Sequence, residues 1–313
     1  MGNKATDSSS GMVTERKRHS FLVGFVIRLV KEKPLGTVGG VIFLLLLLTG
    51  IFANFIAPYG MNEQFWTDAL APPSTTYWLG TDNIGRDILS RVIFGARISV
   101  ITGLAASTLA TIISVVLGML SGYIGGKFDM LVQRFVDAWM CIPALILMMV
   151  LISLIGPGVL QVIIVIGLRW GITGSRIIRS AVIGIKGNVY VEAAEAIGCS
   201  TTRILTRHIL PNVMAPAIIM FSLRVPNVIL TEASLSFLGF GIPPPTPSWG
   251  SMLSGSGRDY MFQAPWMVIW PGLALAIVVY AINMFGDAVR DILDPRLKGG
   301  VGRYGVSQKR KLQ

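Results

Sequence analysis

The chain has 313 residues, of which 52% are hydrophobic and 14% are charged, and its net charge is +11. Several uninterrupted apolar runs reach the roughly 20 residues that a helix needs to cross a lipid bilayer, which excludes a soluble globular protein. In so apolar a chain we attribute the positive balance to membrane topology and anionic lipid rather than to a nucleic-acid partner.

The N-terminal region, residues 1–35, is expected to form a cytoplasmic tail and an interfacial basic helix. The apolar stretch 21–27 is short and is interrupted by Arg28, so it is not a cleavable signal. Residues 16–33 suit a basic helix that lies on the membrane surface. A disordered tail followed by a solvated turn is an equally open interpretation.

Six membrane-spanning helices are predicted, which makes the fold class all-α and the protein polytopic. Each span must be helical because a chain in lipid satisfies its backbone hydrogen bonds internally. The predicted spans are residues 36–57, 98–124, 131–155, 159–178, 213–235 and 266–286.

The distribution of basic residues predicts the orientation of these spans. With the N-terminus inside, 21 of the 27 Lys and Arg residues fall in cytoplasmic segments, and four fall in the external segments 59–97 and 236–265. The positive-inside rule therefore places both termini in the cytoplasm. The transmembrane domain is expected to cover residues 36–297, and residues 298–313 form a basic cytoplasmic tail.

The polar segment 187–212 joins the fourth and fifth predicted spans on the cytoplasmic side. Its residues predict two short helices separated by a turn. Gly198 terminates the first helix, and Ser200 or Thr201 caps the second, which we expect to end before Pro211.

Small and acidic side chains alternate on the first of these helices. Ala193, Ala194 and Ala196 keep it thin, so that its backbone can approach a partner closely, whereas Glu192 and Glu195 offer fixed charges. This pattern indicates a docking element.

On the second helix, Arg203 and Arg207 lie one turn apart and are candidates to pair with acidic lipid or with the two glutamates. An amphipathic loop that rests on lipid headgroups is the alternative interpretation of the whole segment.

The stretch "EAAEAIG" followed by "HILP" resembles the EAA loop of the permease subunits of ATP-binding-cassette importers. The positions that match the general pattern are Glu192, Ala193, Ala194, Gly198, Leu210 and Pro211. His208 departs from it, because the general pattern has isoleucine three residues before the proline. Three further stretches resemble the C-type permease subunit of dipeptide and oligopeptide importers: residues 79–99, 231–253 and 282–297.

The resemblance implies a type I importer permease in a bacterial cell membrane, forming half of a translocation pathway. It implies a second homologous permease subunit, two ATPase subunits that carry ATP and Mg, and an extracytoplasmic substrate-binding protein. This chain itself is expected to bind no cofactor and to catalyse no reaction. Residues 189–211 would couple it to the ATPase, with residues 192–198 as the docking face.

Three ionisable residues fall inside predicted spans, where charge is costly and usually faces the bundle interior or a cavity. Arg169 and Arg224 lie near the middle of the fourth and fifth spans, and Glu232 lies two turns beyond Arg224. One hypothesis is that the arginines line the translocation pathway and attract a substrate carboxylate. The alternative is structural pairing with Glu232 or with helix carbonyls.

Other charged and aromatic residues are interpreted structurally. Arg134 and Asp137 are expected to pair at the inner interface. Arg86 and Asp87 can pair in the first external segment, and Trp249 can anchor the second at the membrane interface.

Peptide is the predicted substrate, with nickel or glutathione as the alternatives within the same branch. Cys141, Cys199, His19 and His208 are too few and too scattered to form a metal site. An ATP-independent secondary transporter or channel would more naturally show an inverted repeat, and no convincing repeat is visible. An intramembrane enzyme would need a nucleophile with a base, or a metal cluster.

Overall fold

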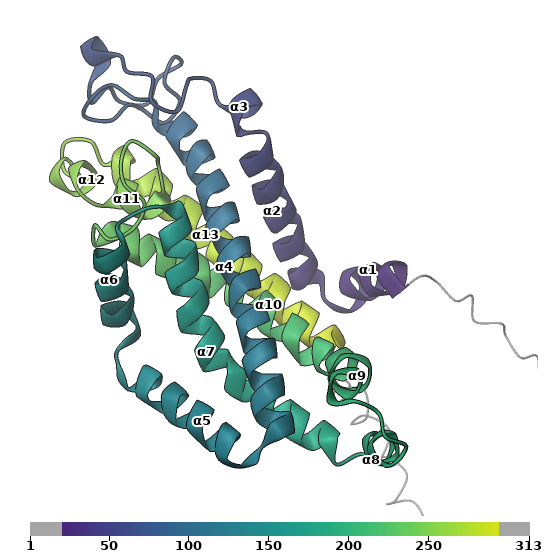
Figure 1. Cartoon of the computed structure of the whole chain (residues 1–313). Coiled ribbons are helices and arrows are strands. Elements are labelled where there is room, and N and C mark those ends of the chain that lie inside the picture. The colour runs from purple at the N-terminus through teal and green to yellow at the C-terminus, as the bar shows by residue number, and fades with distance from the viewer. Residues whose placement is uncertain (1–20, 294–313) are drawn as a thin grey trace, which may run out of the picture.

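The computed structural model describes residues 21–293, and every regular element within them is a helix (Figure 1). Five stretches in this part of the chain are long and apolar enough to cross a membrane: α2 (Pro34–Ile51), α4 (Ile88–Ile124), α7 (Val159–Lys186), residues Thr201–Phe237, and α13 (Trp266–Leu293). A bent pair of helices, α5 and α6, is a sixth candidate span. The prediction of an all-α protein with about six spans is confirmed.

The third predicted span is not one straight helix. It consists of α5 (Gly126–Cys141) and α6 (Ala144–Ile155), which are bent by 94° relative to each other. Pro143 lies in the break, and a proline disfavours a helical conformation for the residue before it and cannot supply the N–H that would continue the hydrogen bonds. A single helix over residues 131–155 was therefore a wrong prediction, although the apolar run itself is helical on both sides of the break.

Three spans extend well beyond their predicted limits, and one of them is α13, which continues to Leu293 instead of ending at residue 286. Helix α4 begins at Ile88 because Asp87 caps it: the Ser90 N–H donates a hydrogen bond of 2.7 Å to Asp87 Oδ2. At the other side of the fold, α7 continues to Lys186. Apolar length predicts where a helix can cross lipid, and it does not predict how far the helix projects beyond it.

Helices α4 and α7 pack closely along their length (Figure 1). Gly118 on α4 is one reason, since a Cβ there would lie 2.6 Å from the Ser175 carbonyl oxygen and 2.7 Å from Ile178 Cβ. Gly122 follows four residues later, and small residues at this spacing let two helix backbones approach in a membrane. Ser114 also donates a hydrogen bond of 2.8 Å across this interface to the Gly171 carbonyl.

The two described ends of the chain lie side by side. Helix α1 (Phe21–Glu32) contacts the last turns of α13, where Leu29 packs with Ala288 and Ile292. An ion pair of 2.5 Å between Lys33 Nζ and Asp291 Oδ2 reinforces the contact. The predicted helix over residues 16–33 is thus observed from Phe21 to Glu32. The first 20 residues of the predicted N-terminal region 1–35, and the whole predicted tail 298–313, lie outside the described residues.

The remaining elements gather at two opposite ends of the bundle (Figure 1). One end carries α3 (Ala53–Ile56), the short helix η1 (Trp66–Asp68), α11 (Trp249–Leu253) and α12 (Ser256–Asp259). The opposite end carries α8 (Val189–Ala196) and α9 (Thr201–Ile204). We refer to these as the cap end and the loop end.

Candidate coupling loop and buried charges

The first helix of the loop end forms as predicted. Helix α8 is followed by Gly198 with a φ of +79°, a left-handed conformation that a residue with a side chain rarely adopts. The Gly198 N–H bonds to the Glu195 carbonyl and the Cys199 N–H to the Ala194 carbonyl, both at 3.0 Å. This pair of bonds is a Schellman motif, which satisfies carbonyls at the helix end and fixes the turn.

The second helix departs from the prediction, because it does not end before Pro211. Ser200 occupies the N-cap position of α9 but makes no side-chain capping bond. The chain then passes through a π-helical turn, Leu205–Ile209, directly into α10 (Leu210–Phe237). Since a proline ring clashes with the carbonyl four residues earlier, the wider turn just before Pro211 accommodates it without breaking the helix. The loop is consequently joined to α10 without a flexible connection.

Helix α8 has a buried face and an exposed face. Val191 and Ala194 are 0% and 5% exposed and pack with Val182, Ile204 and Ile209. The predicted docking range therefore needs a correction at Ala194, which faces the protein's own core and leaves no surface for a partner.

The exposed face of α8 contains more apolar surface than the sequence suggested. Val189 and Ile197 are 80% and 81% exposed, and Tyr190 is 44% exposed. Glu192, Ala193, Glu195, Ala196 and Gly198 are exposed as well. Exposed apolar side chains among charged ones are typical of an interaction site. Val189 and Ile197 lie within the predicted coupling segment 189–211, but the sequence did not indicate that these two side chains would provide its apolar surface.

Tyr123, at the end of α4, ties the loop to a third helix. Its hydroxyl donates a hydrogen bond of 3.0 Å to Glu195 Oε1. Lys186 also contacts this tyrosine. Its Nζ donates a hydrogen bond of 2.8 Å to the Tyr123 carbonyl oxygen and lies 5.1 Å from the ring centroid, in a cation–π contact. No motif in the sequence singles out Tyr123.

The other predicted coupling residues are spread over the same end. Arg203 and Pro211 are exposed and Leu210 is half-buried. Among residues 21–293, Arg203 and Arg207 form no ion pair with Glu192 or Glu195, so that predicted alternative is not observed.

Arg224 on α10 is 7% exposed and lies against α4. Its Nη1 is 3.5 Å from Thr111 Oγ1 and its Nη2 is 3.4 Å from Ser114 Oγ. Gly174 on α7 leaves the space for the guanidinium group, because a Cβ there would collide with Nη2. Arg224 therefore joins α10 to α4 through two hydroxyl groups and packs against α7 at Gly174.

Arg169 and Glu232 likewise have hydroxyl partners. Arg169 is half-buried and bonds to Thr173 Oγ1 on its own helix. Glu232 is 1% exposed and accepts a hydrogen bond of 2.7 Å from Ser236. In the described part of the chain, neither Arg169 nor Arg224 has a carboxylate within 4.0 Å, so the expected pairing with Glu232 is absent. Their role in a translocation pathway stays a prediction.

Ion pairs fix the bent helix α5 to α7 on the loop side. Asp137 pairs with Arg134 at 3.8 Å, as predicted, and more closely with Arg176 on α7. Asp129 accepts a hydrogen bond of 2.6 Å from Arg179 Nε.

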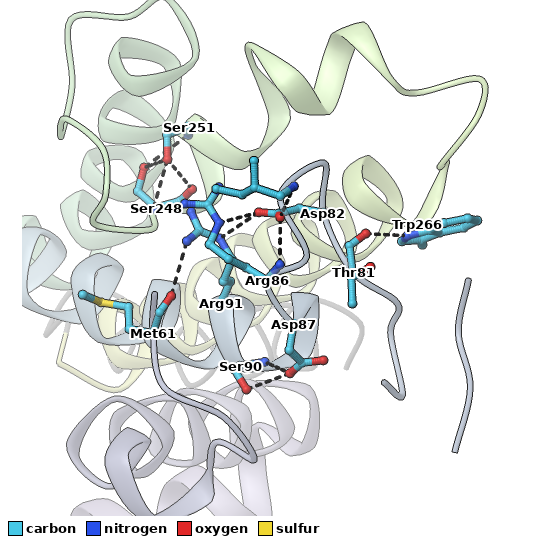
Figure 2. A network of polar contacts seen from close by, with 11 residues as sticks. Met61, Thr81, Asp82, Arg86, Asp87, Ser90, Arg91, Ser248, Ser251 and Trp266 are labelled. Atoms are coloured by element: carbon cyan, nitrogen blue, oxygen red, sulfur yellow. Dashed lines mark hydrogen bonds and ion pairs between the residues drawn. The ribbon is translucent and has the colours of Figure 1, made fainter. Parts of the chain in front are cut away.

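At the cap end, the expected pair of Arg86 with Asp87 does not form (Figure 2). Arg86 instead pairs with Asp82, with 2.6 Å between Arg86 Nε and Asp82 Oδ2. Asp82 Oδ1 also accepts bonds from the backbone N–H groups of Ile84 and Arg86. Asp87 is occupied by capping α4, because the Ser90 N–H and hydroxyl both bond to it at 2.7 Å.

Trp249 is not an interface anchor either. It is 2% exposed, and its Nε1 donates a hydrogen bond of 3.0 Å to the Val92 carbonyl. Gly95 on α4 has no side chain, and this leaves space for the Trp249 indole ring. The residue therefore fixes α11 to α4, inside the protein.

A second tryptophan fixes the segment 59–97, which was predicted to be external, to α13. Trp266 Nε1 donates a hydrogen bond of 3.0 Å to the Thr81 carbonyl (Figure 2). Nearby, Tyr77 donates a bond of 2.8 Å to Asp68. Burial, together with that bond, raises the pKa of Tyr77 to about 12, so its hydroxyl stays a donor.

Comparison with known proteins gives two family matches. Residues 114–299 match the profile of the "binding-protein-dependent transport system inner membrane component", and residues 16–73 match the "N-terminal TM domain of oligopeptide transport permease C". The first match covers more than half of the chain.

Individual relatives are similar over nearly their whole length. The di/tripeptide transport system permease protein DppC of Pseudomonas aeruginosa is 40% identical, over 84% of this chain and 89% of that protein. The oligopeptide permease OppC of Bacillus subtilis is 37% identical, over 86% and 88%. The glutathione transport system permease protein GsiD of Pectobacterium atrosepticum is 37% identical, over 83% and 86%.

A solved structure shares the fold. A chain of the MetNI methionine ABC transporter, in inward-facing conformations, superimposes with a TM-score of 0.51 at 15% identity, over 66% of this chain and 98% of that chain. Spans of this arrangement and relatives of this similarity define a multi-pass permease subunit of an ATP-binding-cassette importer. The chain belongs to the family of binding-protein-dependent transport system inner membrane components.

Proposed function

We propose that this permease subunit imports peptides and that α8 is the element through which a cytosolic ATPase subunit drives it. The relatives named for di/tripeptides and oligopeptides favour the substrate class. The observation that carries the coupling role is the two-faced α8, with Val191 and Ala194 in the core and Val189 and Ile197 exposed.

The remaining assembly follows from the same proposal. A second homologous permease subunit completes the pathway, two ATPase subunits carry ATP and Mg, and an extracytoplasmic binding protein delivers the peptide. The loop end and both termini then face the cytoplasm of a bacterial cell, and the cap end faces outward. The excess of Lys and Arg in the segments 176–207 and 287–313 supports this orientation.

Coupling requires that the ATPase contact α8 differently in two conformations of the transporter. A partner that binds both conformations equally well would not shift the equilibrium between them. Helix α8 begins three residues after α7 ends, and α9 runs into α10 through the π-helical turn. A displacement of α8 is therefore passed to both spans with little slack.

Site-specific cross-linking tests the docking face. In a background with Cys141→Ser and Cys199→Ala, we place a thiol at Ile197→Cys and label it with a photoactivatable maleimide. Capture of an ATPase subunit is expected in the assembled complex. The control, Phe262→Cys, is 89% exposed at the cap end and is expected to capture none. Failure of Ile197→Cys to capture an ATPase in any nucleotide state would contradict the coupling role.

Uptake by the reconstituted complex tests the substrate and the energy source. ATP-dependent accumulation of a labelled dipeptide in proteoliposomes is expected, and it should require the binding protein. The glutathione permease among the relatives makes glutathione the second candidate, so the same vesicles are tested with labelled glutathione. Uptake of either compound without ATP would point to a secondary transporter.

A further inference from the structure

A cavity of about 290 Å³, lined by both polar and apolar side chains, lies at the cap end, outside the coupling loop and the in-span charges. It is lined by the end of the first external segment, by the proline-rich turn after α10, and by the turn between α11 and α12. The polar lining residues that matter here are Asp82, Arg86, Arg91, Ser236, Thr246 and Ser251. A cavity of roughly 150 Å³ already accommodates benzene, so this one has room for a small organic group.

The charges in the cavity are unbalanced. Asp82 is the one carboxylate within 4.0 Å of Arg86 or Arg91 among residues 21–293. It bonds closely to Arg86 but lies 3.9 Å from Arg91 Nε (Figure 2). Two guanidinium groups thus share one carboxylate, and one positive charge is left without a counter-charge.

Arg91 is the side chain with spare bonding capacity. It is 8% exposed, yet in the part of the chain that the structure describes its hydrogen bonding amounts to one long contact, 3.4 Å from Nη1 to the Met61 carbonyl (Figure 2). A guanidinium group carries five N–H donors, and the Arg91 donors that have no partner among residues 21–293 are available to the cavity that this residue lines. A ligand that brings an anionic acceptor would satisfy them.

We propose that this cavity is a carboxylate-binding site, with Arg91 as the principal ligand-binding residue and Arg86 beside it. A planar guanidinium group matches a carboxylate and can donate two parallel hydrogen bonds to it. Thr246 adds a hydroxyl donor to the lining, whereas the Ser251 hydroxyl already donates to the Ser248 carbonyl. Asp82 keeps Arg86 in place and repels a second anion, which limits the site to a single negative charge.

The carboxylate has two possible sources on the outer face. One is the C-terminal carboxylate of an incoming peptide, and the other is an acidic side chain of the binding protein. The choice between these two sources rests on the proposed function and orientation. The proposal that the cavity binds a carboxylate does not depend on either.

Binding of a small probe to the purified, assembled transporter tests the site. The probes are N-acetylglycine and its neutral analogue N-acetylglycinamide, followed by saturation-transfer NMR. The carboxylate is expected to bind at least about tenfold more tightly than the amide, as the loss of a charged hydrogen bond implies. This comparison uses the unaltered protein, so it holds even if variants fold poorly.

Variants then assign the binding to Arg91. Arg91→Gln is expected to abolish the preference for the carboxylate, and Arg91→Lys to keep part of it. Arg258→Gln is the matched control, because this arginine belongs to α12 at the same end but its side chain is 70% exposed. Equal binding of the two probes, no binding of either, or unchanged binding by Arg91→Gln would each overturn the proposal.

Two further measurements on Arg91→Gln identify the source. A weaker affinity for the peptide-free binding protein assigns the carboxylate to that protein. An unchanged affinity with a raised KM for peptide uptake assigns it to the peptide. If transport itself fails in the unaltered complex while N-acetylglycine still binds, the site stands and the proposed function does not.

Discussion

Replacement of Gly118 by alanine tests whether the close approach of α4 and α7 is essential. The new methyl group would lie 2.6 Å from the Ser175 carbonyl oxygen and 2.7 Å from Ile178 Cβ, so the helices must separate. Overpacking of this kind costs about 1–3 kcal/mol of stability. Alanine also favours a helix over glycine by about 1 kcal/mol, which partly offsets the cost.

Gly184→Ala on α7 is the matched control. It is the same substitution in a helix of the same interface, but nothing lies within 4 Å of the added Cβ. The helix-propensity gain is common to both variants, so the difference between them isolates the overpacking cost. At about 2–4 °C per kcal/mol, the Gly118→Ala complex should unfold roughly 2–12 °C below the Gly184→Ala complex.

Thermal unfolding of the purified complex in detergent measures this difference. Peptide uptake per ATP hydrolysed should fall in Gly118→Ala, because residues 175–179 lead directly into α8 along α7. Equal unfolding temperatures for the two variants would refute the close packing. A lower temperature for Gly118→Ala with unchanged uptake per ATP would refute the link from packing to function.

Three further substitutions have defined outcomes. Tyr123→Phe removes the bond to Glu195 and should lower peptide uptake per ATP about fivefold, from a loss of about 1 kcal/mol, while ATPase assembly is unchanged. Tyr280→Phe, the same substitution at a 69% exposed tyrosine of α13, is the control. Gly198→Ala places a side chain on a residue with a φ of +79°, which costs about 1–2 kcal/mol. The turn beside Ile197 should then change, and the cross-linking yield from Ile197→Cys should fall. A normal yield would show that the turn tolerates a side chain. Trp249→Phe keeps an aromatic ring but loses the bond to Val92, so unfolding should require about 1–2 kcal/mol less; an unchanged midpoint would mean that water replaces the donor.

The spans and the loop could be predicted because both depend on local sequence. Apolar runs of sufficient length indicate helices in lipid, and the glycine at position 198 marks the end of α8 whatever surrounds it. The α5–α6 break was in principle visible too, since Pro143 lies within the apolar run. It was missed because hydropathy alone does not distinguish a straight span from a bent one.

The partners of the charged residues could not be predicted, because they depend on contacts between distant segments. Arg86 lies beside Asp87 in sequence, but Asp87 is used to cap α4, so Arg86 turns to Asp82. The inward orientation of Ala194 depends on the apolar surface of α7 and α10, which the local pattern of alanines does not reveal. Tryptophan is a residue type that often lies at a membrane interface, but Trp249 is buried because Gly95 has no side chain and leaves space for its indole ring.

The loop end and Arg224 involve the same three spans. Helix α8 is held to α7 by a short connection, to α10 through the π-helical turn and to α4 through Tyr123. Deeper in the bundle, Arg224 on α10 contacts Thr111 and Ser114 on α4 and fits against Gly174 on α7. A force applied to α8 therefore acts on α4, α7 and α10 together, because these helices contact one another both at the loop end and around Arg224. Such a group moves more readily as one body than by bending of its members, because interfaces this tightly packed do not deform continuously.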